Sequence, residues 1–351
     1  MPTAAAPVAG AGTRPERHGR LTTLPDPRFP GLDAAARSRI VSIVLWANLV
    51  CQMGIILTGG LVRLTGSGLG CSTWPSCEPG QFTPRYTPES GIHPFIEFGN
   101  RTMTGLLGVV AVLVLVVLWR WMRHRGRGFL LLAAVPLIGT AAQAGIGALV
   151  VILHLHPGLV SPHFLISPLL VVASTVLLVR AMDDEGPRRL AVPRAAVWVY
   201  APLAAAGFVV LVLGTIVTGT GPHSGDSGDI TRLLINPVEI ARAHAAAVWV
   251  FCALLVVLLV ILLKGRADRA PRRAAIVLLL LTALQGVIGY VQYFAGLPAA
   301  VVFLHLIGAA LFGGGIAWVG AELVTRRPAP GTEPAEPGAR PEPVAPEGTR
   351  R

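Results

Sequence analysis

Long apolar segments constrain this chain more than any other feature of its sequence. A helix needs about 20 mostly apolar residues to cross a bilayer, and 53% of the residues are hydrophobic while only 13% are charged. Successive segments of that length occupy residues 40–62, 95–119, 129–153, 162–182, 195–219, 238–263, 274–294 and 299–324. Apolar runs of the ~10 residues that a barrel strand uses are not seen between them. The sequence therefore predicts an all-α integral membrane protein with eight transmembrane helices.

Basic residues are concentrated on one side of this predicted bundle. They gather in residues 1–39, 120–127, 180–194, 264–273 and 326–351. The other side keeps Arg63, Arg85, Arg101, Arg232 and Arg242. Because Lys and Arg collect in cytoplasmic loops, we expect a multi-pass protein of the cell membrane with both termini cytoplasmic. This topology accounts for the net charge of +11, so we expect membrane lipid and no nucleic acid as a partner.

The two ends of the chain differ in composition from the apolar segments. Residues 1–39 and 325–351 are rich in Pro, Gly, Ala and charged residues, a composition typical of disordered segments. We expect two disordered cytoplasmic tails. The first apolar run has no small-residue cleavage site behind it, so we expect a retained span and not a signal peptide.

The first four segments resemble the last four. Gln143 and Gly147 in the third segment match Gln285 and Gly289 in the seventh, and His163 in the fourth matches His305 in the eighth. Composition alone could produce some of this likeness. The matched polar landmarks favour two pseudo-twofold-related four-helix bundles, residues 40–182 and 183–324, arranged as a parallel repeat.

Histidines are the ionisable residues that lie well inside these spans. His244 and His305 lie about two turns into the sixth and eighth segments, where an ionisable side chain is costly and usually functional. Two histidines facing each other across a bundle, beside small residues, can ligate a flat macrocycle on both faces. Zinc or copper would need three or four clustered ligands. We therefore expect a haem iron between His244 and His305.

The first half carries a different set of polar residues. It has His163, but Asn100 stands where a histidine matching His244 is expected. Glu97 lies on the same helix face as Asn100 and four residues before Arg101. A simple ion pair with Arg101 would explain Glu97; opposite a candidate iron ligand, Glu97 is also a candidate catalytic group.

Cys71 and Cys77 lie in the long loop after the first segment. On the oxidising side of a membrane two such cysteines are interpreted first as a disulfide. A lone pair at this spacing is a weak zinc motif.

These residues resemble the haem A synthase family over roughly 40–324. The resemblance is carried by TGSGLGCSTWPSC at 65–77, IEFGNRTMTG at 96–105 and the histidines of the fourth, sixth and eighth segments. It implies oxidation of the ring methyl of haem O to a formyl group by successive hydroxylations. It also implies a haem b cofactor on His244 and His305 in residues 183–324. Residues 40–182 would then hold substrate haem O.

The resemblance implies roles for four further residues. His163 would be the axial ligand of haem O, Glu97 the catalytic carboxylate, and Cys71 and Cys77 the outer-loop pair. The family's usual Glu-x-x-His-Arg is here Glu97 to Arg101 with Asn100 in the histidine's place. An amide is a poor iron ligand, so the substrate would be held by His163 alone or also through a water.

Two other functions compete with this interpretation. A membrane b-type cytochrome for electron transfer would use His244 and His305 but not Glu97. A transporter with repeated halves would place polar residues at mid-membrane, not near one surface. For the enzyme, we expect an electron acceptor that the sequence does not identify, and the protohaem farnesyltransferase that makes haem O is a candidate partner.

Overall fold

The computed structural model describes residues 33–223, 225–226 and 232–327 of the chain. Within those residues, eight helices are long and apolar enough to cross a membrane, which confirms the all-α multi-pass fold. The helices are α1 (Ala34–Leu64), α2 (His93–Met122), α3 (Arg127–Ile152), α4 (Pro157–Ala181), α5 (Arg194–Thr220), α6 (Pro237–Lys264), α7 (Arg269–Phe294) and α8 (Ala299–Glu322). A single 3₁₀ turn, η1 (Arg123–Arg125), joins α2 to α3.

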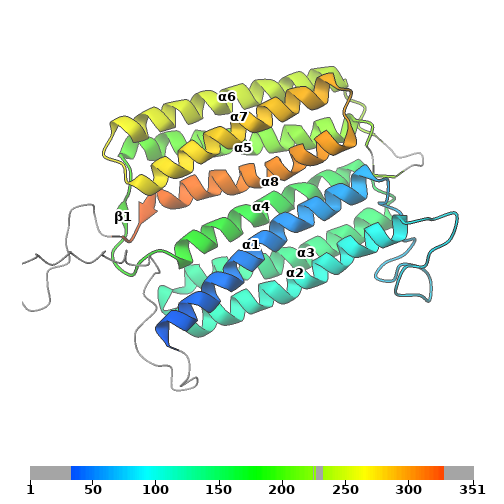
Figure 1. Ribbon diagram of the computed structural model, residues 1–351, viewed down its shortest axis with the longest axis horizontal. Helices are drawn as coiled ribbons and strands as arrows, with labels where there is room; N and C mark the ends of the chain where they lie inside the picture. Colours follow the sequence, from blue (N-terminus) through cyan, green and yellow to red (C-terminus); the bar gives the residue numbers. More distant parts are fainter. Residues whose placement is uncertain (1–32, 224, 227–231, 328–351) are drawn as a thin grey trace, which may run out of the picture.

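The helices form two groups of four that lie side by side (Figure 1). In the first group α1 contacts α2 and α4, and α3 contacts α2 and α4; α5 to α8 repeat the same pattern. Between the groups α4 packs on α8, while α1 touches α8 and α4 touches α5. These paired contacts are what a pseudo-twofold relation would produce. That relation, and the division at residues 182/183, remain predictions that the contacts support.

The helices extend beyond the predicted apolar segments. α1 begins at Ala34, more than a turn before residue 40, where the Asp33 carboxylate accepts a hydrogen bond of 2.6 Å from the Ala36 amide. α7 likewise begins at Arg269 instead of residue 274. Hydropathy marks only the part of a helix in the hydrocarbon, whereas charged turns can continue it into the headgroup region. α4 begins at Pro157, so His163 lies nearly two turns inside and not in the first turn.

The basic end of the bundle is closed by a short sheet. β1 (Arg189–Leu190) pairs antiparallel with β2 (Val324–Thr325), joining the connection between the halves to the end of α8. Buried Asp183 accepts hydrogen bonds from the Thr325 hydroxyl at 2.8 Å and the Arg326 amide at 2.9 Å. Thr325, assigned to a disordered tail from the sequence, is therefore ordered. Most of both predicted tails, 1–32 and 328–351, lies outside the described residues.

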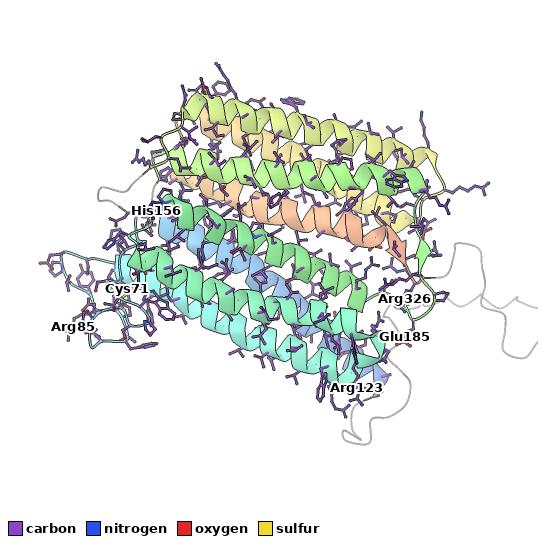
Figure 2. The ribbon with its side chains drawn as sticks, turned by 180° about the vertical axis from the view of Figure 1, so that it is seen from behind. Cys71, Arg85, Arg123, His156, Glu185 and Arg326 are labelled. Atoms are coloured by element: carbon purple, nitrogen blue, oxygen red, sulfur yellow. A yellow bond between two sulfur atoms is a disulfide. The ribbon has the colours of Figure 1, made fainter. Side chains whose placement is uncertain are left out.

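The apolar cores occupy the half of each bundle nearest the basic end. In the first group the core includes Leu45 of α1, Leu118 of α2 and Leu177 of α4. In the second it includes Phe251 of α6, whose ring centroid lies 4.8 Å from that of Phe312 in α8. The opposite end carries Cys71, Arg85 and His156, and the basic end Arg123, Glu185 and Arg326 (Figure 2). We call the Cys71 end the outer end.

Candidate functional site: a cavity and a paired-histidine site

The first helix group is hollow toward its outer end. A cavity of about 1130 Å³ lies among α1, α2, α3 and α4, and the loop after α1 contributes Trp74 and Phe82 to its wall. The second group also contributes to the wall, through Thr218 of α5 and Leu306 of α8. Glu97, Asn100 and His163, which the sequence singled out separately, all line this one cavity.

His163 is held at the wall through its backbone, and a glycine faces its ring. The Gln143 side-chain amide of α3 donates 2.8 Å hydrogen bonds to the His163 carbonyl and the Ser167 hydroxyl. Gly147 faces the imidazole so closely that a Cβ there would lie 3.4 Å from Cε1. The buried ring nitrogen Nδ1 finds no hydrogen-bond partner in the described part of the chain. A glycine of α3 thus packs directly against an imidazole at the cavity surface.

Asn100 is held from α1. The Thr58 hydroxyl lies 2.7 Å from Asn100 Oδ1 and 3.2 Å from the Ile55 carbonyl oxygen. The backbone of Gly59 faces the same side chain, and a Cβ there would lie 3.8 Å from Oδ1. Thr58 is a site residue that the sequence reasoning missed, because a threonine in an apolar helix carries no distinctive signal.

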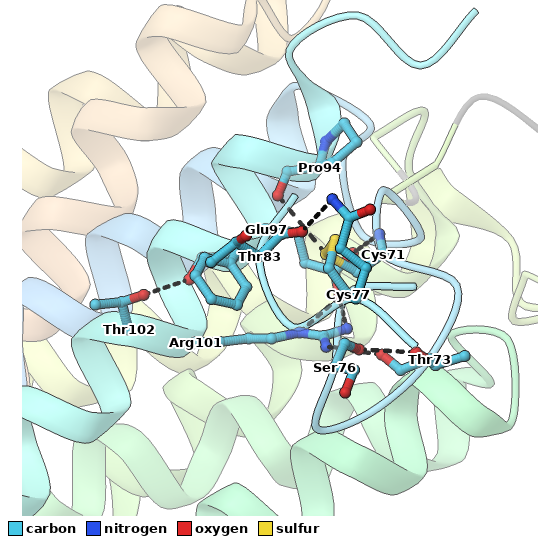
Figure 3. The surroundings of a disulfide bond; sticks show 11 residues. Cys71, Thr73, Ser76, Cys77, Thr83, Pro94, Glu97, Arg101 and Thr102 are labelled. Atoms are coloured by element: carbon cyan, nitrogen blue, oxygen red, sulfur yellow. Dashed lines mark hydrogen bonds and ion pairs between the residues drawn. A yellow bond between two sulfur atoms is a disulfide. The ribbon is translucent and has the colours of Figure 1, made fainter. Parts of the chain in front are cut away.

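Both carboxylate oxygens of Glu97 are engaged. Oε2 accepts a 2.7 Å hydrogen bond from the Cys71 amide, and Oε1 pairs with the Arg101 guanidinium (Figure 3). The same guanidinium donates to the carbonyls of Thr73 at 2.7 Å and Ser76 at 3.2 Å. Glu97 is only 4% exposed. The expected ion pair is present, and with Arg101 it fastens the outer loop over the cavity.

The loop itself is closed by a disulfide. Cys71 and Cys77 are bonded and both fully buried, which confirms the disulfide expected from their position. Figure 3 places this disulfide directly beside Glu97 and Arg101. The loop, the carboxylate and the cavity wall are therefore one connected structure.

The second helix group pairs two histidines. The His244 ring nitrogen Nδ1 lies 3.1 Å from the Val210 carbonyl oxygen, a contact that assigns the proton to Nδ1 and leaves Nε2 free. His305 is held as His163 is, since Gln285 donates a 2.8 Å hydrogen bond to its carbonyl. His244 of α6 and His305 of α8 thus belong to the same four-helix group. That they share one site remains a prediction from the sequence.

The three histidines His163, His244 and His305, and Asn100, each lie against a glycine of the preceding helix. Gly214 approaches the His244 ring and Gly289 the His305 ring, where a Cβ would lie 3.3 Å and 3.4 Å from Cε1. Gly147 and Gly59 do the same for His163 and Asn100. From the sequence, Gly147 and Gly289 were only matched positions of the repeat. In the structure they pack against the rings of the candidate ligands.

Two cations lie at the outer end of the cavity. Arg63 donates a 2.7 Å hydrogen bond to the Thr218 carbonyl across the interface between the two helix groups, and Arg232 lines the same end. Among the described lining residues the other charged side chains are Glu97 and Arg101, which neutralise each other. The cavity thus has a net positive outer end and largely apolar walls.

The described residues contain no cluster of three or more His, Cys, Asp or Glu side chains that could hold a bare metal ion. Paired histidines backed by glycines instead fit a planar, doubly ligated group. Fold and cavity therefore define a class: a multi-pass helical membrane protein whose two four-helix groups carry histidines at matched positions, with His163 of the first group lining a large cavity. Within this class the chain belongs to the COX15-CtaA family, described as cytochrome oxidase assembly proteins, whose family model matches residues 42–223 and 240–344. This is the haem A synthase family.

Individual relatives agree with the family assignment. A protein of Bacillus mycoides named heme A synthase is 25% identical over 278 residues, covering 75% of this chain and 87% of the relative. A heme A synthase of Shouchella clausii is 33% identical over 157 residues, covering 42% of this chain and 48% of the relative. One of Alkalihalophilus pseudofirmus is 31% identical over 150 residues, covering 42% and 48%.

Proposed function

We propose that this protein is a haem A synthase: an oxidoreductase that converts the ring methyl of haem O to a formyl group by successive hydroxylations. The observation that carries the proposal is the shared cavity of Glu97, Asn100 and His163 in a chain of this family. The N-terminal half, residues 40–182, binds haem O. The C-terminal half, residues 183–324, binds a haem b cofactor.

The cavity has the chemistry that haem O requires. Haem O is a flat apolar macrocycle with two propionates on one edge and a farnesyl chain on the opposite edge. The apolar walls suit the ring and the chain, and Arg63 and Arg232 suit the propionates at the outer end. His163 would hold the haem iron. Asn100 faces the cavity where the second half has His244, and because an amide is a poor iron ligand, the iron would be held by His163 alone or also through a water.

The second site has the donors that haem b requires. His244 and His305 present imidazoles from α6 and α8, and the Val210 carbonyl fixes the His244 tautomer that leaves Nε2 for iron. A haem b held there supplies one-electron transfer. The protein would hold the haem b iron through His244 and His305, orient the haem and exclude water from it.

Glu97 is the group we assign to proton handling. Turning a methyl into a formyl group removes hydrogens from the carbon and adds one oxygen, so protons and electrons must both leave. A carboxylate at the cavity wall can accept a proton from water or stabilise positive charge at the ring edge. Its bonds to Cys71 and Arg101 hold it in place for that role. The electrons pass to an acceptor that stays unidentified.

The cellular setting follows from the charge distribution. The end that carries Arg123 and Arg326 faces the cytoplasm, and the disulfide loop faces the outside of the cell membrane. The protohaem farnesyltransferase that makes haem O is a candidate partner, because its lipid-soluble product must reach the same membrane.

The test is to express the protein with and without a source of haem O, extract the pigments and measure their masses. We expect haem b in both samples and haem A only when haem O is supplied. The rival function, a b-type cytochrome, predicts haem b alone in both. Haem O that is neither bound nor oxidised by the purified protein would overturn the proposal.

A further inference from the structure

The inner part of the cavity contains polar groups with no partner. Gln52 of α1 is fully buried and lines the cavity, and neither its amide nitrogen nor its amide oxygen has a hydrogen-bond partner among the described residues. The Thr140 hydroxyl of α3 is also buried, lines the cavity and lacks a partner in that part of the chain. Leaving such buried groups unpaired lowers stability, so a ligand that pairs them would be bound selectively.

These two residues lie at the same depth on facing helices. Gln52 is about 18 Å from the outer end of α1, and Thr140 about 18 Å from the outer end of α3, at 1.5 Å per residue. His163 lies only about 9 Å from the outer end of α4. The cavity is therefore layered, with Arg63 and Arg232 outermost, His163 in the middle and the Gln52 and Thr140 level innermost.

The second half lacks this innermost level, although it repeats the glutamine and the histidine as Gln285 and His305. The position matching Thr140 is Thr282, whose hydroxyl is satisfied by a 2.7 Å hydrogen bond to the Leu278 carbonyl. The positions matching Gln52 fall at 205–207, which are Ala, Ala and Gly. By contrast, other unpaired atoms occur in both halves. They are Oε1 of Gln143 and Gln285, and Nδ1 of His163 and His305. Among the residues that the structure describes, only the first half therefore offers unpaired polar atoms at the inner level.

The apolar wall continues past this level. Leu106, Val109 and Leu137 line the cavity there, and the first two are largely exposed on the outer surface of α2. Nothing in the described structure comes within 4 Å of a Cβ built on Gly105 or Gly108. The inner end of the cavity thus opens between side chains that face lipid, where an apolar chain can leave.

We propose that Gln52, together with Thr140, recognises the hydroxyl group on the ring substituent of haem O and so selects haem O over protohaem. Haem O differs from protohaem in one substituent, where a hydroxyl-bearing carbon carrying the farnesyl chain replaces a vinyl group. With the propionates at Arg63 and Arg232 and the iron at His163, the opposite ring edge reaches the Gln52 level. Its hydroxyl pairs with the amide, and the chain leaves past Leu106 and Val109.

This orientation also explains the place of Glu97. The methyl that is oxidised lies on the pyrrole that bears one of the propionates, so it lies toward the outer end. Glu97 lies about one turn inside α2, on the outer side of His163. The hydroxyl site and the carboxylate would therefore act at different edges of the same ring. The inference rests on the proposed function, since it assumes that the cavity binds haem O.

The experiment measures haem binding to protein whose second half is loaded with haem b. Three probes are titrated: haem O, protohaem, and iron haematoporphyrin, which carries hydroxyethyl groups without a farnesyl chain. The variants are Gln52→Leu and Thr140→Val, which remove the polar atoms with little change of shape, and the matched control is Thr282→Val. We expect each of the first two to weaken haem O and iron haematoporphyrin about tenfold to a hundredfold. Protohaem binding should stay within about threefold, and Thr282→Val should keep the wild-type preference.

The inference would be overturned if Gln52→Leu and Thr140→Val both kept the wild-type ratio of haem O affinity to protohaem affinity. A change confined to Gln52→Leu would keep the role of Gln52 and remove that of Thr140. Equal weakening of all three probes would identify a structural role and also overturn it. If the wild-type protein oxidises haem O while the variants keep its preference, only this inference fails. If the wild-type protein neither prefers nor oxidises haem O, the proposed function fails.

Discussion

The Glu97 carboxylate joins the outer loop to α2. Its role can therefore be tested by changing this one side chain. Its oxygens are bonded to the Cys71 amide and to Arg101, so removing its charge affects the loop and any chemistry at once. The two effects can be separated, because Arg101 anchors the loop through the Thr73 and Ser76 carbonyls as well.

We expect Glu97→Gln to stop haem A production while haem b stays bound at His244 and His305. The amide keeps the shape of the side chain but cannot accept a proton from water. Haem O or a partly oxidised form should accumulate, as measured by pigment mass after extraction. The control is Arg101→Gln, which breaks the same ion pair and leaves the carboxylate. Equal loss of haem A in both variants would return Glu97 to a purely structural role, and normal haem A from Glu97→Gln would exclude a catalytic one.

The two histidines of the second half give a second single-residue test. We expect His244→Ala or His305→Ala to abolish the six-coordinate low-spin haem b, because each removes one axial ligand. The optical spectrum and haem content of the purified protein measure this. His156→Ala, at the start of α4 and outside both sites, serves as the control. An unchanged spectrum in either ligand variant contradicts the assignment.

The site residues that could be predicted from the sequence are those whose side chains are energetically costly to place in lipid. Glu97, His163, His244 and His305 stand out because ionisable groups rarely lie in a span. Gln52, Thr58 and Thr140 did not, because uncharged polar residues are common at helix interfaces in membranes. Only the packing reveals which of them is unpaired and faces a cavity. The glycines behind the rings were missed for the same reason.

At the level of whole helices, the sequence predicted the number and type of elements but not their ends. Hydropathy measures the apolar middle of a span, so α1, α4 and α7 all begin earlier than the apolar pattern indicates. The short pairing of β1 with β2 had no signal, because two residues on each side carry no alternating pattern. Asp183 supports it, because its carboxylate accepts hydrogen bonds from Thr325 and Arg326 beside the pairing.

We expect Asp183→Ala to lower the free energy of unfolding by about 2–4 kcal/mol, because the buried Thr325 hydroxyl and Arg326 amide lose their common acceptor. Thermal unfolding of the detergent-solubilised protein measures the change. The neighbouring Asp184→Ala is the matched control and should have a much smaller effect. Equal thermal midpoints for Asp183→Ala and the wild type would show that the sheet contributes nothing to stability.

At the level of the whole molecule, orientation in the membrane is the open prediction. We expect a cysteine introduced as Arg85→Cys to react with a membrane-impermeant thiol reagent added to intact cells, and one introduced as Arg123→Cys to react only after lysis. The reason is the excess of Arg at the Arg123 end. Cys51 and Cys252 lie in helices and are partly buried, so the parent protein measures the background. The reverse labelling pattern would invert the topology.

The cavity wall has a consequence for how the protein is made. Thr215, Thr218 and Leu306 belong to the second helix group, yet they close the cavity of the first. A ribosome that has completed only α1 to α4 has therefore inserted four helices whose pocket is still open on one side to the bilayer. The pocket becomes complete only when α8 docks. Biogenesis thus imposes a sequence of events in which a ligand can be fully enclosed in this cavity only after nearly the entire polypeptide has been translated.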